Sequence, residues 1–232
     1  MATLPKYPKY DNPRENRLAK EHRLIHEFCE QSDVIEYEAK KRRGHLPPER
    51  YLIHYNIRSI VGVDKSQMPI FGERHTAEII IPKRYPLGGQ PGCWMRTPVW
   101  HPNIKFGGPI DGKICVNEDA LGSWHTLDMM IERIGEILQY RNYHALNTPP
   151  HPEDANVATW VREFAEPAGI VDKARGKFVD NTPLLRPDPK YLESRKEQIR
   201  IIINRPREKP TQPPAPDKLV APKRKKVVID LK

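Results

Sequence analysis

The sequence TPVWHPNIKFGGPIDGKICVN occupies residues 97–117, and no helical or strand periodicity runs through it. Between Pro98 and Ser123 four glycines and three prolines accompany the polar run HPN at 101–103. A long irregular segment inside a compact domain is often functional, because loops carry binding and catalytic side chains. Near its end Cys115 follows glycines and lies beside a lysine, a setting that favours an accessible thiol.

A helix is predicted to start at Pro13. Asn12 is a suitable N-cap, Pro13 suits the first helical position, and Glu15 follows three residues after the cap. The apolar residues that follow fall largely on one helical face: Leu18, Ile25, Phe28 and Cys29. The helix is therefore amphipathic, and we expect Cys29 to be a small buried core residue rather than a reactive thiol.

Between this helix and residue 98 the hydrophobic period changes to two. Apolar residues alternate at 35–39, 51–57 and 77–81, and a fourth strand is expected around 93–97. Turn-forming residues separate the runs: Gly44, Pro47, Pro48, Gly62, Pro69 and Gly72. Connections this short favour an antiparallel meander over parallel strands linked by crossovers.

Helical spacing returns after Ser123, in two stripes that we expect to face the core: Leu127, Met130, Ile131, Ile134 and Leu138, then Val157, Trp160, Val161 and Phe164. Together these patterns predict an α+β fold. It consists of an N-terminal helix, a four-stranded antiparallel meander sheet, an irregular active-site segment and C-terminal helices.

The formal net charge of +9 is concentrated at the C-terminal end. Residues 205–232 contain nine Lys or Arg and three Asp or Glu, so they carry six of the nine net positive charges. This tail is proline-rich and lacks aromatic residues for base stacking, so we expect no specific nucleic-acid binding. Its basic run at 223–226 is similar to a nuclear import signal, which in a eukaryotic cell would predict nuclear localisation.

The sequence lacks the patterns of membrane spans, signal peptides and paired cysteines. No run approaches the roughly 18 consecutive apolar residues of a membrane span, and residues 1–16 lack the apolar core of a signal peptide. We therefore expect a cytoplasmic protein without membrane contact. Cysteines 29, 93 and 115 share no short spacing, which predicts neither a disulfide framework nor a zinc site. Cys93 is expected to be structural.

One ordered set of motifs carries a family resemblance: Tyr85-Pro86, Thr97-Pro98, His101-Pro102-Asn103, Gly112-Lys113-Ile114-Cys115, Ser123-Trp124 and Pro150-His151-Pro152-Glu153-Asp154. This order resembles the ubiquitin-conjugating enzyme family over roughly residues 13–166. The resemblance implies a UBC-like fold and a thioester on Cys115. It implies three partners, a ubiquitin-like protein, a ubiquitin-activating-like enzyme and a protein substrate, and no cofactor or metal.

The resemblance also has local departures. The interval from Asn103 to Cys115 is longer than is usual in the family, with an insertion expected at 106–109, and residues 140–149 also look expanded. Residues 142–167 are more similar to relatives encoded in bacterial operons beside an activating enzyme and a deconjugating metalloprotease. The implied organisation is an N-terminal extension (1–12), a catalytic domain (13–168), a C-terminal helical extension (169–205) and the basic tail (206–232).

The resemblance assigns roles to particular residues. Cys115 is the nucleophile that accepts the modifier and passes it to a lysine or another amine. Asn103 either stabilises the oxyanion or orders the loop around the cysteine. Asp154 either helps to deprotonate the incoming lysine or caps the next helix. His101, Pro102 and Trp124 are expected to be structural.

Other functions remain open at this point. A non-catalytic UBC variant would bind a ubiquitin-like protein without a thioester, but Cys115 stands in register with the HPN run. A thiol hydrolase would pair Cys115 with His101 or His125. A base able to activate water beside a thioester would waste the intermediate, so we expect His101 to hold a turn instead.

Overall fold

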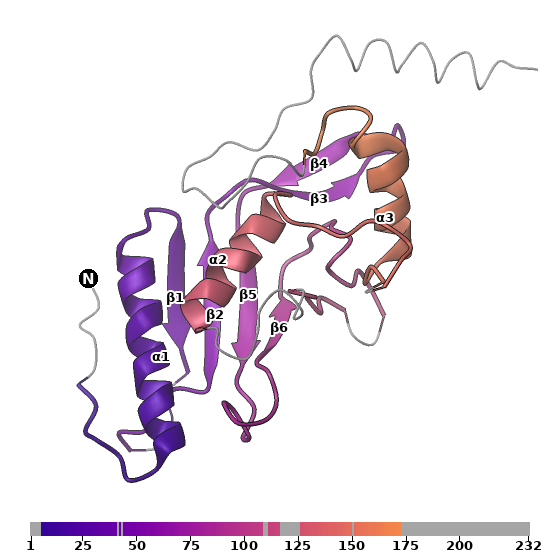
Figure 1. The fold of residues 1–232 in the computed structure, drawn as a ribbon. Helices are drawn as coiled ribbons and strands as arrows, with labels where there is room; N and C mark the ends of the chain where they lie inside the picture. Colours follow the sequence, from indigo (N-terminus) through magenta and orange to yellow (C-terminus); the bar gives the residue numbers. More distant parts are fainter. Residues whose placement is uncertain are drawn as a thin grey trace, which may run out of the picture. The chain divides into compact units, whose positions relative to one another are not determined.

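The computed structural model describes residues 6–40, 42, 44–108, 111–116, 126–149 and 151–172. Its elements are α1 (Pro13–Glu30), β1 (Ile35–Ala39), β2 (Arg50–Tyr55), β3 (Ser59–Val63), β4 (Pro69–Gly72), β5 (His75–Ile80), β6 (Gly92–Met95), α2 (Leu127–Leu138) and α3 (Ala155–Trp160) (Figure 1). A π-helical turn, Val161–Ala165, continues α3. Within the described ranges, no helix is long and apolar enough to cross a membrane.

The predicted α+β fold with a four-stranded antiparallel sheet is confirmed. The strand order is β1-β2-β5-β6, and β5 pairs with both β2 and β6. The inward side chains of this sheet join α1 and α2 in one core, and Tyr55 Oη donates to the Ile131 carbonyl at 2.9 Å. Fully buried members of the core come from α1, β2, β5 and α2: Leu18, Ile25, Tyr51, Ile53, Ala77, Ile79 and Ile134.

A second sheet, formed by β3 and β4, was not predicted. Gly62, Pro69 and Gly72 were expected in turns, and that prediction is wrong, because all three lie in these strands. The β2–β5 pairing continues into β3–β4, but the register changes between them. Three residues separate Tyr55 from Ser59, whereas only two separate their partners, His75 and Gly72. A further register shift follows Ile60. Such irregularities interrupt the hydrogen-bond ladder and divide one long hairpin into two sheets.

Helix α1 begins as predicted. Asn12 Oδ1 accepts a hydrogen bond from Arg14 N at 2.9 Å, and Pro13 occupies the first helical position. The Glu15 carboxylate is directed to Arg42 rather than back to the cap, with Arg42 Nη1 donating to it at 2.9 Å. The start of the helix is therefore fixed by its cap, and its first acidic residue ties it to the chain before β2.

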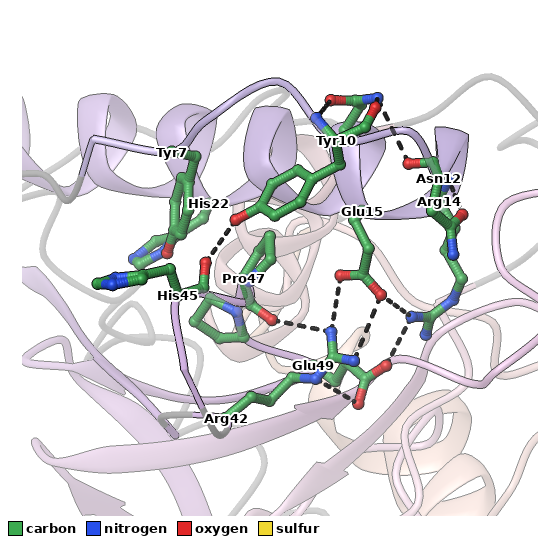
Figure 2. A network of polar contacts seen from close by, with 12 residues as sticks. Tyr7, Tyr10, Asn12, Arg14, Glu15, His22, Arg42, His45, Pro47 and Glu49 are labelled. Carbon is green, nitrogen blue, oxygen red and sulfur yellow. Dashed lines mark hydrogen bonds and ion pairs between the residues drawn. The ribbon is translucent and has the colours of Figure 1, made fainter.

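The described N-terminal residues 6–12 pack against α1 (Figure 2). Tyr7 Oη lies 2.6 Å from His22 Nδ1, and Tyr10 Oη donates to the His45 carbonyl. Figure 2 also shows the guanidinium groups of two arginines directed at the carboxylate of Glu49; they are Arg14, at 2.6 Å, and Arg42, at 3.2 Å. The described part of the expected N-terminal extension, residues 6–12, is thus attached to the domain.

A buried carboxylate joins three separate parts of the chain. Glu21 is fully buried in α1 and accepts hydrogen bonds from Arg17 Nε at 2.5 Å and Tyr85 Oη at 2.6 Å. It also accepts from Leu127 N at 2.8 Å, at the start of α2, where Thr126 makes no side-chain cap. A helix N-terminus favours a negative charge, and a buried carboxylate needs such partners to be stable. Glu21 therefore caps α2 from another helix.

The two C-terminal helical stripes are confirmed, because their predicted members are buried in α2 and in α3 with its π-helical turn. The fourth strand, expected around 93–97, is β6 and starts one residue earlier. The predicted helical extension and basic tail, apart from residues 169–172, lie outside the described residues.

The segment that carries Cys115 is partly regular, which corrects the prediction of an irregular stretch. Met95 N donates to the Gly112 carbonyl at 2.7 Å, and Ile114 N donates to the Cys93 carbonyl at 3.0 Å. Residues 112–114 therefore pair antiparallel with β6 and extend the sheet by a short piece of backbone. Gly112 has φ of +79°, and a Cβ atom there would lie 2.2 Å from the Met95 carbonyl oxygen.

We expect Gly112→Ala to destabilise the domain far more than Gly107→Ala. Both glycines have φ of +79°, but a Cβ atom at Gly107 meets nothing within 4 Å. Gly107→Ala should cost about 1–2 kcal/mol for the left-handed conformation alone. Gly112→Ala adds the backbone clash and should cost roughly 3–4 kcal/mol. Urea unfolding of both variants measures the difference, and equal losses would show that contact with β6 does not select glycine at 112.

Candidate functional site

Cys115 lies on an extended segment whose side chains alternate between the inside and the outside. Gly112, Ile114 and Val116 are buried, whereas Lys113 is exposed and Cys115 is partly exposed. This alternation is that of a strand with one face on the core. The β6 pairing thus holds the backbone while the Cys115 thiol stays on the side that solvent reaches.

Asn103 binds the Cys115 backbone from the opposite side. Cys115 N donates to the Asn103 carbonyl at 2.8 Å, and Asn103 Nδ2 donates to the Cys115 carbonyl at 3.2 Å. Asn103 Oδ1 accepts from His144 N at 2.8 Å, so the same side chain also fixes the 140–149 loop. Of the two roles open from sequence, the described contacts are those of a loop-ordering residue. Its NH₂ group has two donors, so one hydrogen bond does not exhaust them.

His101 is completely buried beneath this turn. Its Nδ1 accepts a hydrogen bond from Asn103 N at 3.0 Å, and its ring lies 4.4 Å from the Tyr140 ring, centroid to centroid. Tyr140 Oη donates to the Trp100 carbonyl. Burial lowers the pKa of His101 to about 3, so the imidazole is neutral at physiological pH. A proton on Nδ1 would remove the acceptor that Asn103 N uses.

Asp154 is the N-cap of α3. Its Oδ1 accepts hydrogen bonds from Asn156 N at 3.0 Å and Val157 N at 3.2 Å, and the residue is 7% exposed. Asp154 N donates to the Pro102 carbonyl at 3.2 Å, which places the start of α3 against the HPN turn. The capping interpretation is confirmed, and the role in amine transfer stays a prediction.

An ion pair beside Cys115 was not predicted. Lys113 Nζ lies 2.9 Å from Glu153 Oε1, linking the cysteine segment to the residues before α3. The sequence signal for Lys113 is its position two residues before the cysteine. The sequence gives no such signal for Glu153, because its proximity to Lys113 depends on how residues 151–154 fold against Pro102.

The other two cysteines lie in the core. Cys29 is 7% exposed and burial raises the pKa of its thiol to about 12. Cys93 is 4% exposed, and its Sγ lies 3.2 Å from Met130 Sδ. Because a thiolate is the reactive form and needs access, neither thiol is suited to nucleophilic chemistry. The prediction that both are structural agrees with their positions.

Two predicted residues fall outside this description: Trp124, expected to pack beside the site, and His125, the second histidine considered for a hydrolase. Within the described residues, no cluster of three or more His, Cys, Asp or Glu side chains is arranged to hold a metal ion.

Comparisons with known proteins add no assignment. No protein-family model matches the chain, and no curated protein matches it. Function is therefore inferred from the geometry and chemistry of the residues around Cys115.

We expect His101 to make the domain less stable in acid. The unfolded chain takes up a proton at His101 as pH falls through about 6.5, whereas the folded protein does so only near 3. Between these values the free energy of unfolding should fall by up to about 1.4 kcal/mol per pH unit from this residue. His101→Asn keeps an acceptor for Asn103 N and removes the titration, so its stability should depend less on pH.

Urea unfolding at pH 7, 6, 5 and 4 measures this slope. The control is His151→Asn, at an exposed position, which should leave the slope as it is in the native protein. If His101→Asn and native protein lose stability in parallel as the pH falls, burial of a neutral His101 is not what limits stability in acid.

Proposed function

We propose that this protein is a ubiquitin-like-modifier conjugating enzyme with a UBC-like fold. It accepts a modifier as a thioester on Cys115 and transfers it to a lysine or another amine. The observation that carries the proposal is the pairing of a partly exposed Cys115 with Asn103 of the HPN turn, through two hydrogen bonds. The α+β fold and the order of motifs along the chain support it.

The reaction has two acyl transfers. First the Cys115 thiolate attacks the thioester carbonyl of the modifier on its activating enzyme; a new C–S bond forms and the old one breaks. Then an amine attacks the carbonyl on Cys115, a C–N bond forms and the thiolate leaves. The amine must lose its proton to attack, so an acidic residue that receives the proton would speed only the second transfer.

The position of His101, among the residues that the structure describes, supports acyl transfer rather than hydrolysis. A hydrolase needs an imidazole that reaches the thiol or a water molecule. His101 is fully buried, its Nδ1 accepts from Asn103 N, and its low pKa makes it a weak base. A thioester beside such a histidine has no help from it in activating water, which favours survival of the intermediate until an amine arrives.

Asn103 and Asp154 act in this proposal through position. Asn103 fixes the backbone carbonyl of Cys115 and the 140–149 loop, which holds the thioester in one orientation. Asp154 joins α3 to the HPN turn, and its carboxylate is the acidic group that we assign to the incoming amine. Its capping bonds use Oδ1, and the Oδ2 atom is the one we assign to the amine.

We expect Cys115→Ser to form a stable oxyester. Mixed with the cognate activating enzyme, modifier and ATP, native protein should give an adduct that a thiol reductant cleaves, whereas the serine variant should give a resistant one. An alcohol is a poorer leaving group than a thiol, so the ester survives. Gel analysis with and without reductant reads the outcome. Iodoacetamide should label Cys115 in the folded protein and spare buried Cys29 and Cys93. Attachment of the modifier to Cys29 or Cys93 would refute the assignment of Cys115 as the nucleophile.

A substitution at Asp154 should separate loading of Cys115 from discharge to the amine. Asp154→Asn should load normally but discharge to lysine about 10- to 100-fold more slowly, the low end of general-base effects. Asparagine caps a helix about as well as aspartate, so stability should be almost unchanged. Raising the pH should partly restore discharge by supplying neutral lysine. Single-turnover discharge of preloaded enzyme at two pH values tests this, and equal rates at neutral pH would leave Asp154 with capping alone.

A further inference from the structure

We propose that Lys113 is an acceptor for the modifier carried on Cys115, so that the enzyme conjugates itself at Lys113. The inference rests on the proposed thioester and adds a modification site to it. It arises from two observations: the Lys113 amine forms an ion pair with the Glu153 carboxylate, and Lys113 lies two residues before Cys115 in a segment paired with neighbouring backbone.

The strand geometry puts the lysine and the cysteine on one face. Lys113 pairs with Trp94 of β6, and Ile114 pairs with Ile104, so this segment is extended on both sides. In extended backbone, side chains two residues apart point the same way, with Cα atoms about 7 Å apart. Burial agrees, because Ile114 is 5% exposed between an exposed Lys113 and a partly exposed Cys115.

The lysine amine is directed toward the α3 side of the site. Its Nζ lies 2.9 Å from Glu153 Oε1, and the Glu153 side chain is 17% exposed. The next residue, Asp154, donates its backbone N–H to the Pro102 carbonyl at 3.2 Å, which fixes this acidic stretch against the HPN turn. Lys113 thus presents its amine to Glu153, which directly precedes Asp154, the residue that the proposed mechanism assigns to an incoming lysine.

The chemical step needs no additional reagent. The Lys113 ammonium gives a proton to the Glu153 carboxylate or to water, and the neutral Nζ attacks the thioester carbonyl on Cys115. A C–N bond forms, the C–S bond breaks and the Cys115 thiolate leaves, taking up the second proton that the attacking nitrogen loses. The product is an isopeptide on Lys113 and a free thiol. A tether this short gives the amine an effective concentration of roughly millimolar or higher.

The experiment follows preloaded full-length enzyme after the activating enzyme has been stopped, with no added amine. We expect the reductant-sensitive adduct to convert into a reductant-resistant one, with peptide mapping placing the modifier on Lys113. Lys113→Arg keeps a cation for Glu153 but removes the acceptor amine. It should load as fast as native protein and form about 10-fold less resistant adduct, because its tethered acceptor is gone.

Lys105→Arg is the matched control. Lys105 lies opposite Lys113 in the short hairpin, where its N–H donates to the Lys113 carbonyl at 2.9 Å, but the Glu153 ion pair belongs to Lys113. This variant should form resistant adduct at the native rate. A matching loss in Lys105→Arg, or mapping of the modifier to Lys105, would overturn the assignment to Lys113.

Two further outcomes separate this inference from the proposed function. If native protein loads at Cys115 but the thioester decays only by hydrolysis, or resistant adduct forms as well in Lys113→Arg, self-conjugation at Lys113 is wrong and the conjugating activity stands. If no thioester forms at Cys115, both fall. An observed rate constant that does not change with enzyme concentration supports transfer within one molecule, and a rate constant that rises in proportion to enzyme concentration contradicts it.

Discussion

Met95 and Gly112 meet through a backbone hydrogen bond of 2.7 Å, and the position of the candidate nucleophile depends on that contact. The close approach leaves no room for a side chain at 112 and requires a positive φ there. Once it forms, the alternation of the strand sets Ile114 into the core and turns Cys115 outward. The β6 edge, which would otherwise present unpaired backbone groups, holds the segment that carries Cys115.

The polar atoms around the cysteine are largely committed to holding the backbone. Asn103 binds Cys115 and His144, His101 binds Asn103, and Asp154 caps α3. If the proposed thioester forms, the described side chains hold it in place, and His101 offers water little assistance. An enzyme of this kind would gain its rate from positioning and from the approach of the amine, rather than from a strong base.

Local patterns made the main elements predictable from sequence. The cap at Asn12, the period of two in β1, β2 and β5, and the apolar stripe of α2 each depend on neighbouring residues. The β3–β4 sheet was missed because Gly62 and Gly72 are typical turn residues, and only the register of the partner strand makes them part of a ladder. In the candidate site, the accessibility of Cys115 was predicted from its sequence setting, and the thiol is partly exposed. The ion pair of Lys113 with Glu153 was not, because 40 residues separate its partners.

The contacts of Glu21 bear on the order in which parts of the chain fold during synthesis. Its carboxylate finds Arg17 within its own helix, but the Leu127 N–H that it caps follows 106 residues later in the chain. At about 5–20 residues per second, a ribosome needs roughly 5 to 20 seconds to add that stretch. Until then the Glu21 carboxylate is more stable in water than in an apolar core, because burying a charge without its partners costs free energy. The nascent α1 should therefore dock late, after the β2–β5 hairpin has formed and α2 has emerged.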